Sequence, residues 1–329
     1  MCARVGLGLW RPVGALALVI AFAGCRSETP DHEGVAPTAG ASAALPAPPV
    51  APKSGAAEPA RELTWAFEST PVGPMSVVVS VPAHTAAQKF PVLVALHGRG
   101  EAFKGPARGA RGWIDDYGLG RAIERLAHPP LVSDDYGGQV ELARLTSLNQ
   151  RLAQAPYAGL IVVCPYTPDI LAGRRAFSAA EPLAAFIVDQ LLPRVFRDTP
   201  ALTAPNSVGI DGVSLGGRAA LLVGFERPKS FAVVASLQAA IDASEIPPLV
   251  SRARQARASN PELVLRLLTS DHDYFVREIQ ALSAAFREAD VVHSFVRVRG
   301  DHSYEFNRGP GVFEMLTFHA WALRGEPTL

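Results

Sequence analysis

The stretch SVGIDGVSLGGRAALLV, residues 207–223, carries the pattern that decides how this chain folds. Residues 207–211 are β-prone and largely apolar, residues 212–216 read Gly-Val-Ser-Leu-Gly, and residues 217–223 read as the start of a helix. Strand, Gly-x-Ser-x-Gly and helix in this order are the context of a nucleophile elbow, a turn so tight that only glycine fits two residues before and after the serine. We therefore predict that Ser214 is a nucleophile and that the backbone N–H of Leu215 faces a developing oxyanion.

The composition is that of an ordinary globular protein. The chain has 329 residues, 48% of them hydrophobic, which is enough for one large domain with a sizeable core. Its 31 basic and 31 acidic side chains give a formal charge of zero, so nothing indicates a nucleic-acid partner or a polybasic membrane surface. Three cysteines, at positions 2, 25 and 164, are too scattered for a disulfide framework or a metal site. Cys164 lies in an apolar run and is expected to be a small buried side chain.

The start of the chain reads as an export signal. Basic residues precede an apolar run over residues 13–23, which is too short to span a bilayer and suits the core of a signal peptide. The run leads into Phe-Ala-Gly-Cys, and small residues before a cysteine resemble the bacterial lipobox, in which the cysteine is lipidated. We expect residues 1–24 to be removed and Cys25 to carry the lipid; the alternative is an ordinary secretory signal with an incidental cysteine. Both interpretations predict export, and Arg26 favours an outer-membrane lipoprotein, facing the periplasm or the surface.

A low-complexity segment separates this signal from the rest of the chain. Residues 25–60 are rich in Ala, Pro, Gly, Ser and Thr and almost lack large apolar side chains, so they bury too little surface to fold. We predict a disordered tether, followed by a single domain over residues 61–329.

Buried strands alternate with helices along this domain. Strands are predicted at residues 63–68, 75–81, 90–96, 160–164, 207–211, 231–237, 263–268 and 294–299. Helices are predicted at residues 183–196, 218–225, 275–289 and 312–323. This alternation is typical of an α/β fold with a mostly parallel central sheet, helices on both faces and an antiparallel hairpin at the N-terminal end.

An insertion over about residues 101–156 interrupts the alternation, because no strand is evident there. It holds Gly-rich loops and two expected helices, around residues 119–126 and 140–153. Two interpretations stay open. The insertion is either an elaboration over the C-terminal edge of the sheet or a surface addition unrelated to the substrate.

Histidines located after strands are the candidates for a general base. In an open parallel sheet the chemistry gathers at the C-terminal ends of the strands, and only His97, His272 and His302 fall just after one. His302 is favoured, because it follows the last strand and a turn and precedes the final helix. His97 is expected to hold the turn whose N–H groups complete an oxyanion hole. His272 is the alternative base.

The acid that orients the base should follow the preceding strand. Asp271-His272-Asp273 stands at that place, directly before a helix. We favour Asp273 as the acid and keep Asp271 as the alternative, the other carboxylate serving to cap the helix. With Ser214 and His302, the order along the chain is nucleophile, acid, base, as in α/β-hydrolases.

Three segments resemble the α/β-hydrolase group that contains esterase D, the feruloyl esterases of xylan degradation, the enterochelin esterases and the mycolyltransferases. They are residues 90–100, which end in a Leu-His-Gly turn, the elbow at 212–216, and residues 299–306, which read RGDHSYEF. The resemblance spans about residues 63–323 and is patchy through the insertion.

This resemblance implies a mechanism and a set of roles. Ser214 would attack the carbonyl carbon of an ester, His302 would take the serine proton, and Asp273 would fix the imidazole tautomer. The backbone N–H groups of Leu215 and Arg99 would stabilise the tetrahedral oxyanion, by about 3 kcal/mol for each donor. Water would release the acyl-enzyme, and no metal or organic cofactor is expected.

Three functions are the resulting hypotheses. The leading one is a lipid-anchored serine esterase that acts outside the cytoplasm on a small-molecule or polysaccharide-linked ester. The second is an acyltransferase with the same triad and a sugar or lipid hydroxyl as acceptor. The third, from another class, is a non-catalytic surface binding protein on a hydrolase scaffold.

Loop side chains near the expected site bear on the substrate. Arginines there either favour an acidic ester or are solvated surface charges; they are Arg99, Arg108, Arg111, Arg174 and Arg175. Aromatic residues there either line an acyl or aryl pocket or pack the insertion; they are Trp113, Tyr136 and Tyr166.

Overall fold

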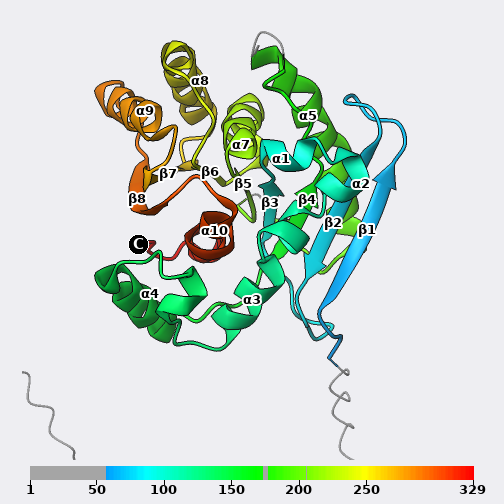
Figure 1. Ribbon diagram of the computed structural model, residues 1–329. Coiled ribbons are helices and arrows are strands. Elements are labelled where there is room, and N and C mark those ends of the chain that lie inside the picture. The colour runs from blue at the N-terminus through cyan, green and yellow to red at the C-terminus, as the bar shows by residue number, and fades with distance from the viewer. Residues whose placement is uncertain (1–56, 173–176, 205) are drawn as a thin grey trace, which may run out of the picture. The chain divides into compact units, whose positions relative to one another are not determined.

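The strands form one mixed sheet in the computed structural model, which describes residues 57–172, 177–204 and 206–329 (Figure 1). Their spatial order is β1-β2-β4-β3-β5-β6-β7-β8. Their bounds are Arg61–Phe67 (β1), Met75–Val81 (β2), Val92–Leu96 (β3), Ile161–Pro165 (β4), Val208–Gly212 (β5), Val233–Leu237 (β6), Val264–His272 (β7) and Ser294–Asp301 (β8). β2 is antiparallel to both β1 and β4, and all other neighbours are parallel. The predicted α/β class, with a mostly parallel sheet and an N-terminal hairpin, is confirmed.

Several expectations fall outside the described residues, namely the leader over residues 1–24, Cys25, the tether up to residue 56, Arg174 and Arg175. At the end of the tether, Glu58 pairs with His84 through two backbone hydrogen bonds of 2.7 and 2.9 Å. Within the described ranges, no helix combines the length and the apolar character that crossing a bilayer requires.

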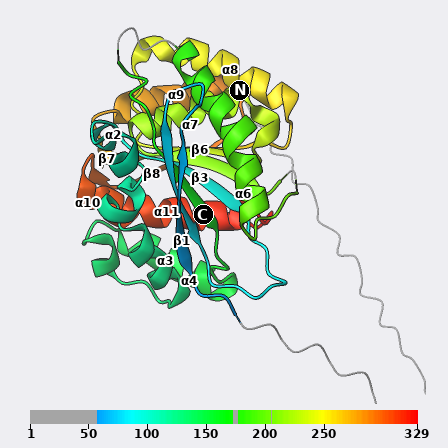
Figure 2. The same ribbon diagram turned by 90° about the vertical axis from the view of Figure 1, so that its right-hand side faces the viewer.

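Helices cover both faces of the sheet, as the perpendicular views show (Figures 1 and 2). One face carries Glu181–Ala185 (α5), Phe186–Leu191 (η4), Leu192–Asp198 (α6), Leu215–Glu226 (α7), Ile246–Ser259 (α8) and Val276–Glu288 (α9). The other carries Leu119–Ala127 (α3), Leu142–Gln154 (α4) and Val312–Ala322 (α11). Strands β3, β4, β5 and β6 are buried along their whole length, because each face packs against helices. Burial on both faces explains why the sequences of these strands are continuous apolar runs.

Short helical turns connect these elements: Arg99–Ala102 (α1), Gly105–Gly109 (α2), Gly112–Asp116 (η1), Ser133–Tyr136 (η2), Phe177–Ala180 (η3), Pro228–Ser230 (η5), Ala243–Glu245 (η6), Tyr304–Phe306 (α10) and Asn307–Gly311 (η7). The helical stretch predicted over residues 183–196 is present as α5, η4 and α6 in succession, and its middle, η4, is wound as a π-helix. Pro193 stands in the first turn of the adjoining α6 segment. Proline has no N–H for the preceding turn, so a regular helix cannot run through it undisturbed.

Strand β7 is longer than the sequence suggests. It runs to His272 instead of ending near residue 268, because β8 pairs with it as far as Asp301. Asp271 therefore lies within the strand and not in a loop after it, whereas Asp273 lies beyond its end.

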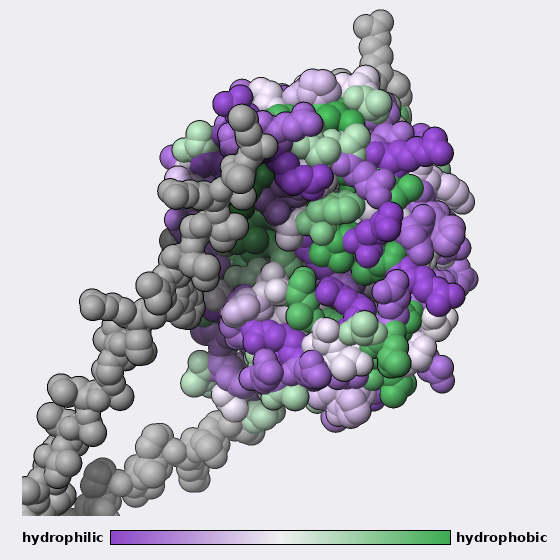
Figure 3. Space-filling view, turned by 90° about the vertical axis from the view of Figure 1, so that its left-hand side faces the viewer, coloured by the Kyte–Doolittle hydropathy of each residue, from purple (hydrophilic) through white to green (hydrophobic). Residues whose placement is uncertain are grey.

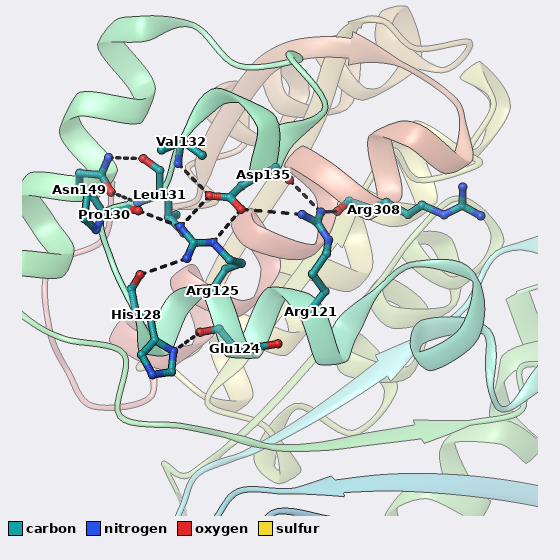
Figure 4. Close-up of polar contacts among 10 residues, drawn as sticks. All are labelled: Arg121, Glu124, Arg125, His128, Pro130, Leu131, Val132, Asp135, Asn149 and Arg308. Atoms are coloured by element: carbon teal, nitrogen blue, oxygen red, sulfur yellow. Dashed lines mark hydrogen bonds and ion pairs between the residues drawn. The ribbon is translucent and has the colours of Figure 1, made fainter.

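The insertion divides into two parts that lie in different places in the fold. The elements α1, α2 and η1 lie near the C-terminal ends of the strands, whereas α3 and α4 belong to the layer that packs on one face with α11 (Figure 1). Charged side chains hold the second part in place through hydrogen bonds (Figure 4). Buried Asp135 accepts a hydrogen bond of 2.8 Å from Arg125 Nε, and Arg121 donates one of 2.8 Å to the carbonyl oxygen of Arg308 in η7. The insertion thus supports the segment that comes after His302.

The edge of the sheet at β8 is polar. Arg297 and Arg299 are exposed on this strand, and the space-filling view of the face formed by α9, β8 and α4 shows hydrophilic residues interrupting the hydrophobic ones (Figure 3). Charged residues on an edge strand discourage pairing with the edge of another sheet.

Candidate active site

Ser214 lies in a tight turn between β5 and α7, at the C-terminal edge of the sheet. Its backbone has φ 58° and ψ −115°, a conformation that residues with a side chain rarely adopt. A Cβ on Gly212 would come within 2.5 Å of the Gly216 carbonyl group, and a Cβ on Gly216 would meet the carbonyl oxygen of Leu96. Both glycines are therefore needed because backbone passes directly against them. This geometry is that of the elbow predicted from residues 207–223.

Ser214, His302 and Asp273 form a hydrogen-bonded line. Nε2 of His302 lies 3.0 Å from Oγ of Ser214, and Nδ1 lies 2.7 Å from Oδ1 of Asp273. Both distances are within the reach that a nucleophile, its base and the group orienting the base require. The three side chains come from segments located after β5, β7 and β8, which are parallel strands that end at the same edge of the sheet.

The carboxyl group of Asp273 is fixed by further contacts. It is only 4% exposed. The hydroxyl of Thr269 donates to Oδ2 at 2.6 Å, and the backbone N–H of Phe275 donates to Oδ1 at 3.1 Å. Sequence reasoning did not identify Thr269, because a threonine inside a buried strand gives no sign that it turns toward an acid four residues later.

Asp271, the alternative acid, is engaged elsewhere. Its Oδ1 accepts the backbone N–H of Gly300 at 2.8 Å and lies 3.0 Å from Nδ1 of His272. Burial raises the pKa of this carboxyl, but the Gly300 N–H and His272 outweigh that effect and the pKa is lowered. The side chain of His272 is 78% exposed. Neither Asp271 nor His272 contacts the line formed by Ser214, His302 and Asp273.

Two aromatic rings frame the imidazole of His302. The centroid of Tyr274 lies 5.2 Å from that of His302 with an interplanar angle of 32°, and the ring of Phe275 meets it nearly edge-on at 5.4 Å. These rings limit how far the imidazole can swing. Their place directly after Asp273 in the sequence is the signal that could have found them.

His97 supports the turn before α1. Its Nδ1 lies 2.8 Å from the carbonyl oxygen of Gly98, and its Nε2 accepts the backbone N–H of Thr167 at 2.8 Å. Burial lowers the pKa of this histidine to about 4, so the ring is neutral near pH 7. The imidazole thereby fixes the turn after β3 against the segment after β4, as the sequence suggested.

Arg99 and Leu215 occupy equivalent places in two helices. Each is the first residue of its helix, α1 and α7 respectively. The first N–H groups of a helix have no acceptor within that helix, so they are available to an anion. The guanidinium of Arg99 donates to Oδ2 of Asp169 at 2.9 and 3.0 Å, and Arg99 also lines the pocket at Ser214.

A pocket of about 220 Å³ opens at Ser214. It is lined by Gly98, Arg99, Gly100, Glu101, Tyr117, Val213, Ser214, His302, Ser303, Tyr304 and Asn307. A hollow of about 540 Å³ lies at the opposite edge of the sheet, near the start of β7. It contains neither a nucleophile beside a base nor an oxyanion turn, so we place the chemistry in the smaller pocket.

The side chains expected to contact the substrate are largely elsewhere. Trp113 and Tyr136 belong to the insertion and are buried in the core, and Tyr166 packs against His97, so the packing interpretation holds for these aromatics. Arg111 pairs with Asp115 at 2.8 Å. The aromatic residues that do line the pocket are Tyr117 and Tyr304.

Glu101 is a further residue of this site that sequence reasoning did not identify. It is buried under the turn after β3 and accepts hydrogen bonds from the hydroxyls of Tyr117 and Tyr304. A glutamate in a Gly-rich loop usually signals a solvated charge. Its burial depends on a tyrosine 203 positions away, so no local pattern reveals it.

In the described part of the chain, no three His, Cys, Asp or Glu residues gather as metal ligands would. The arrangement places a serine hydroxyl, an imidazole and a carboxyl group in series beside two helix N-termini. Such a series can activate a nucleophile and stabilise an oxyanion.

Comparison with known proteins identifies the fold that carries this site. No family model and no curated protein matches the chain. Among solved structures, a ferulic acid esterase matches with a TM-score of 0.59 at 16% identity, over 81% of this chain and 98% of its own. S-formylglutathione hydrolase from Staphylococcus aureus matches with a TM-score of 0.56 at 14% identity, over 80% and 100%. A feruloyl esterase module from Clostridium thermocellum, complexed with sinapinate, matches with a TM-score of 0.55 at 15% identity, over 85% and 95%. The chain therefore has the α/β-hydrolase fold of these esterases.

Proposed function

We propose that this protein is a serine hydrolase that cleaves a carboxylic ester through an acyl-enzyme on Ser214. The observation that carries the proposal is the line from Ser214 through His302 to Asp273, with separations of 3.0 and 2.7 Å. The line ends in a pocket that is bordered by the N-terminus of α1. The N–H groups at this terminus stabilise the negative charge of the tetrahedral intermediate.

The first half of the reaction forms the acyl-enzyme. With the His302 ring proton on Nδ1 and directed at Asp273, Nε2 accepts the proton of the Ser214 hydroxyl as Oγ attacks the carbonyl carbon. The carbonyl electron pair moves to oxygen, and the N–H groups of Arg99 and Leu215 stabilise that charge. Collapse of the intermediate expels the alcohol, which takes the proton from His302.

The second half restores the enzyme. His302 Nε2 removes a proton from water, and the resulting hydroxide attacks the acyl carbon. The tetrahedral intermediate collapses to a carboxylic acid, and the proton returns from His302 to Oγ of Ser214. Measuring the free acid against an ester of an added sugar or lipid alcohol distinguishes hydrolysis from acyl transfer.

The size of the pocket bears on the substrate. Pockets for drug-sized ligands usually measure about 300–1,000 Å³, so about 220 Å³ suits a short group. The similar structures are named as ferulic acid and feruloyl esterases and as S-formylglutathione hydrolase. A panel of p-nitrophenyl esters of increasing chain length, with one feruloyl ester, tests this, and we expect kcat/KM to fall as the acyl chain lengthens.

Export and lipid attachment are part of the proposal. The apolar run over residues 13–23, the Phe-Ala-Gly-Cys sequence ending at Cys25 and the tether after it support a domain held at a membrane through an N-terminal lipid.

A fluorophosphonate probe tests the proposed function. The probe reacts with serines that have an active base, so we expect the wild type to be labelled and Ser214→Ala not to be. Ser303→Ala serves as the matched control, because Ser303 also lines the pocket but donates its hydroxyl to Asp301 at 2.6 Å. A folded wild type that takes no label would contradict the proposal.

A further inference from the structure

One buried carboxyl group connects two walls of the pocket. Glu101, only 1% exposed, receives the hydroxyl of Tyr117 on Oε2 and the hydroxyl of Tyr304 on Oε1, the latter at 2.6 Å. Nζ of Lys104 lies 3.6 Å from Oε1. Because a buried carboxyl needs partners for its oxygens, the two tyrosine hydroxyls stabilise Glu101 in this position.

Tyr117 extends the cluster to the turn after β3. Its hydroxyl oxygen accepts the backbone N–H of Gly98 at 3.1 Å while its proton goes to Glu101. Burial, reinforced by the charge of Glu101, raises the pKa of Tyr117 well above its ordinary value, so the hydroxyl stays protonated and remains a donor. The hydroxyl of Tyr117 therefore holds in place the turn that leads to the N–H of Arg99.

Tyr304 extends the cluster to the loop of the base. It stands close to His302 in the chain, yet its hydroxyl reaches across the pocket to helix α1. A Cβ on Gly100 would lie 2.8 Å from this hydroxyl, so Tyr304 rests directly against the backbone of α1. The ring contacts the cationic groups of Lys104 at 6.0 Å and Arg308 at 5.8 Å, which hold it in this orientation.

We propose that Tyr304 and Glu101 are positioning residues that set the distance between the oxyanion turn and the base. Their hydrogen bond ties the loop carrying His302 to the helix whose first N–H belongs to Arg99. This inference rests on the proposed function, because it assigns a role in stabilising the intermediate formed at Ser214. A misplacement of about 1 Å at such a site can lower turnover by about 10²-fold.

The variant Tyr304→Phe tests the proposal, because it removes one oxygen atom and keeps the ring. We expect kcat for a short p-nitrophenyl ester to fall at least tenfold while KM changes less than threefold, since the hydroxyl positions protein groups and does not bind the ester. The rate of fluorophosphonate labelling should fall in parallel. Tyr136→Phe is the control for loss of a tyrosine hydroxyl: Tyr136 is buried, whereas Tyr304 is 39% exposed, and the hydroxyl of Tyr136 has no partner within the described ranges.

A double-mutant cycle with Glu101→Ala, which leaves no side-chain acceptor for the Tyr304 hydroxyl, measures the coupling between the two residues. If the two side chains act through one hydrogen bond, the double variant should be no slower than Glu101→Ala alone. Should Glu101→Ala fail to fold, the kcat of Tyr304→Phe alone tests the proposal. A labelled wild type together with an unaffected kcat in Tyr304→Phe would overturn this inference and leave the esterase proposal standing. An unlabelled wild type would overturn both.

Discussion

Oδ1 of Asp273 lies 2.7 Å from Nδ1 of His302, whereas the carboxyl group of Asp271 accepts the backbone N–H of Gly300. The two aspartates are separated in the chain by a single residue, but only one of them faces the site. The end of β7 causes the difference: Asp271 still belongs to the strand, and Asp273 lies past it in the turn that leads to α9.

Substituting each aspartate by asparagine should therefore give unequal results. Asp273→Asn removes the acceptor that keeps the His302 proton on Nδ1, and we expect kcat to fall by about 10⁴-fold. Asp271→Asn should change kcat by no more than a few fold. Steady-state kinetics with p-nitrophenyl acetate measure both, and equal losses in the two variants would contradict the assignment.

The sequence was sufficient for the parts of the site that depend on local geometry. A turn that requires Gly212 and Gly216 must be written in the residues around Ser214, and parallel strands bring His302 to the same edge whatever lies between. The acid stayed ambiguous because the length of β7 depends on its pairing with β8 as far as Asp301, which residue types in β7 do not record.

The strained backbone of Ser214 predicts a separation of stability from activity. Glycine adopts φ 58° and ψ −115° at little cost, whereas a side chain there costs on the order of 1–3 kcal/mol. We expect Ser214→Gly to unfold at a higher temperature than Ser214→Ala, both being inactive. Thermal unfolding followed by circular dichroism measures this, and a lower midpoint for Ser214→Gly would argue against strain at the elbow.

Buried His97 predicts how stability depends on pH. Burial lowers its pKa from 6.5 to about 4, so the unfolded chain takes up a proton below pH 6.5 that the folded protein does not accept until near pH 4. The free energy of unfolding should therefore decrease across this window, by about 2 kcal/mol from this group at pH 5. Denaturant unfolding at pH 7 and pH 5 measures the loss. It should be smaller in His97→Gln than in the wild type and unchanged in His128→Gln, an exposed histidine; identical losses in all three proteins would exclude His97 as the cause.

The proposed lipid attachment at Cys25 predicts a change of location without a change of activity. Cys25→Ala should move the protein from the membrane fraction to the soluble fraction and abolish incorporation of labelled fatty acid, while kcat of the purified domain stays the same. Fractionation of expressing bacteria provides the measurement. Retention of labelled lipid by Cys25→Ala would contradict Cys25 as the site of attachment.

Long-range contacts explain what sequence reasoning could not reach. Glu101 reads as a loop charge, and only the folded chain shows it between Tyr117 and Tyr304. The insertion likewise shows no motif that predicts a contact, yet Arg121 donates a hydrogen bond to the carbonyl oxygen of Arg308 in η7, the segment that comes after His302 (Figure 4). Neither contact obeys a periodic pattern, because both join segments that meet only after the sheet has formed.

The central claim, an acyl-enzyme on Ser214, is tested most directly by mass spectrometry of protein quenched in acid while it turns over p-nitrophenyl acetate. The account predicts one acetyl group on the peptide that contains Ser214, and none in Ser214→Ala. An acetyl group on another residue, or turnover that survives in Ser214→Ala, would contradict it.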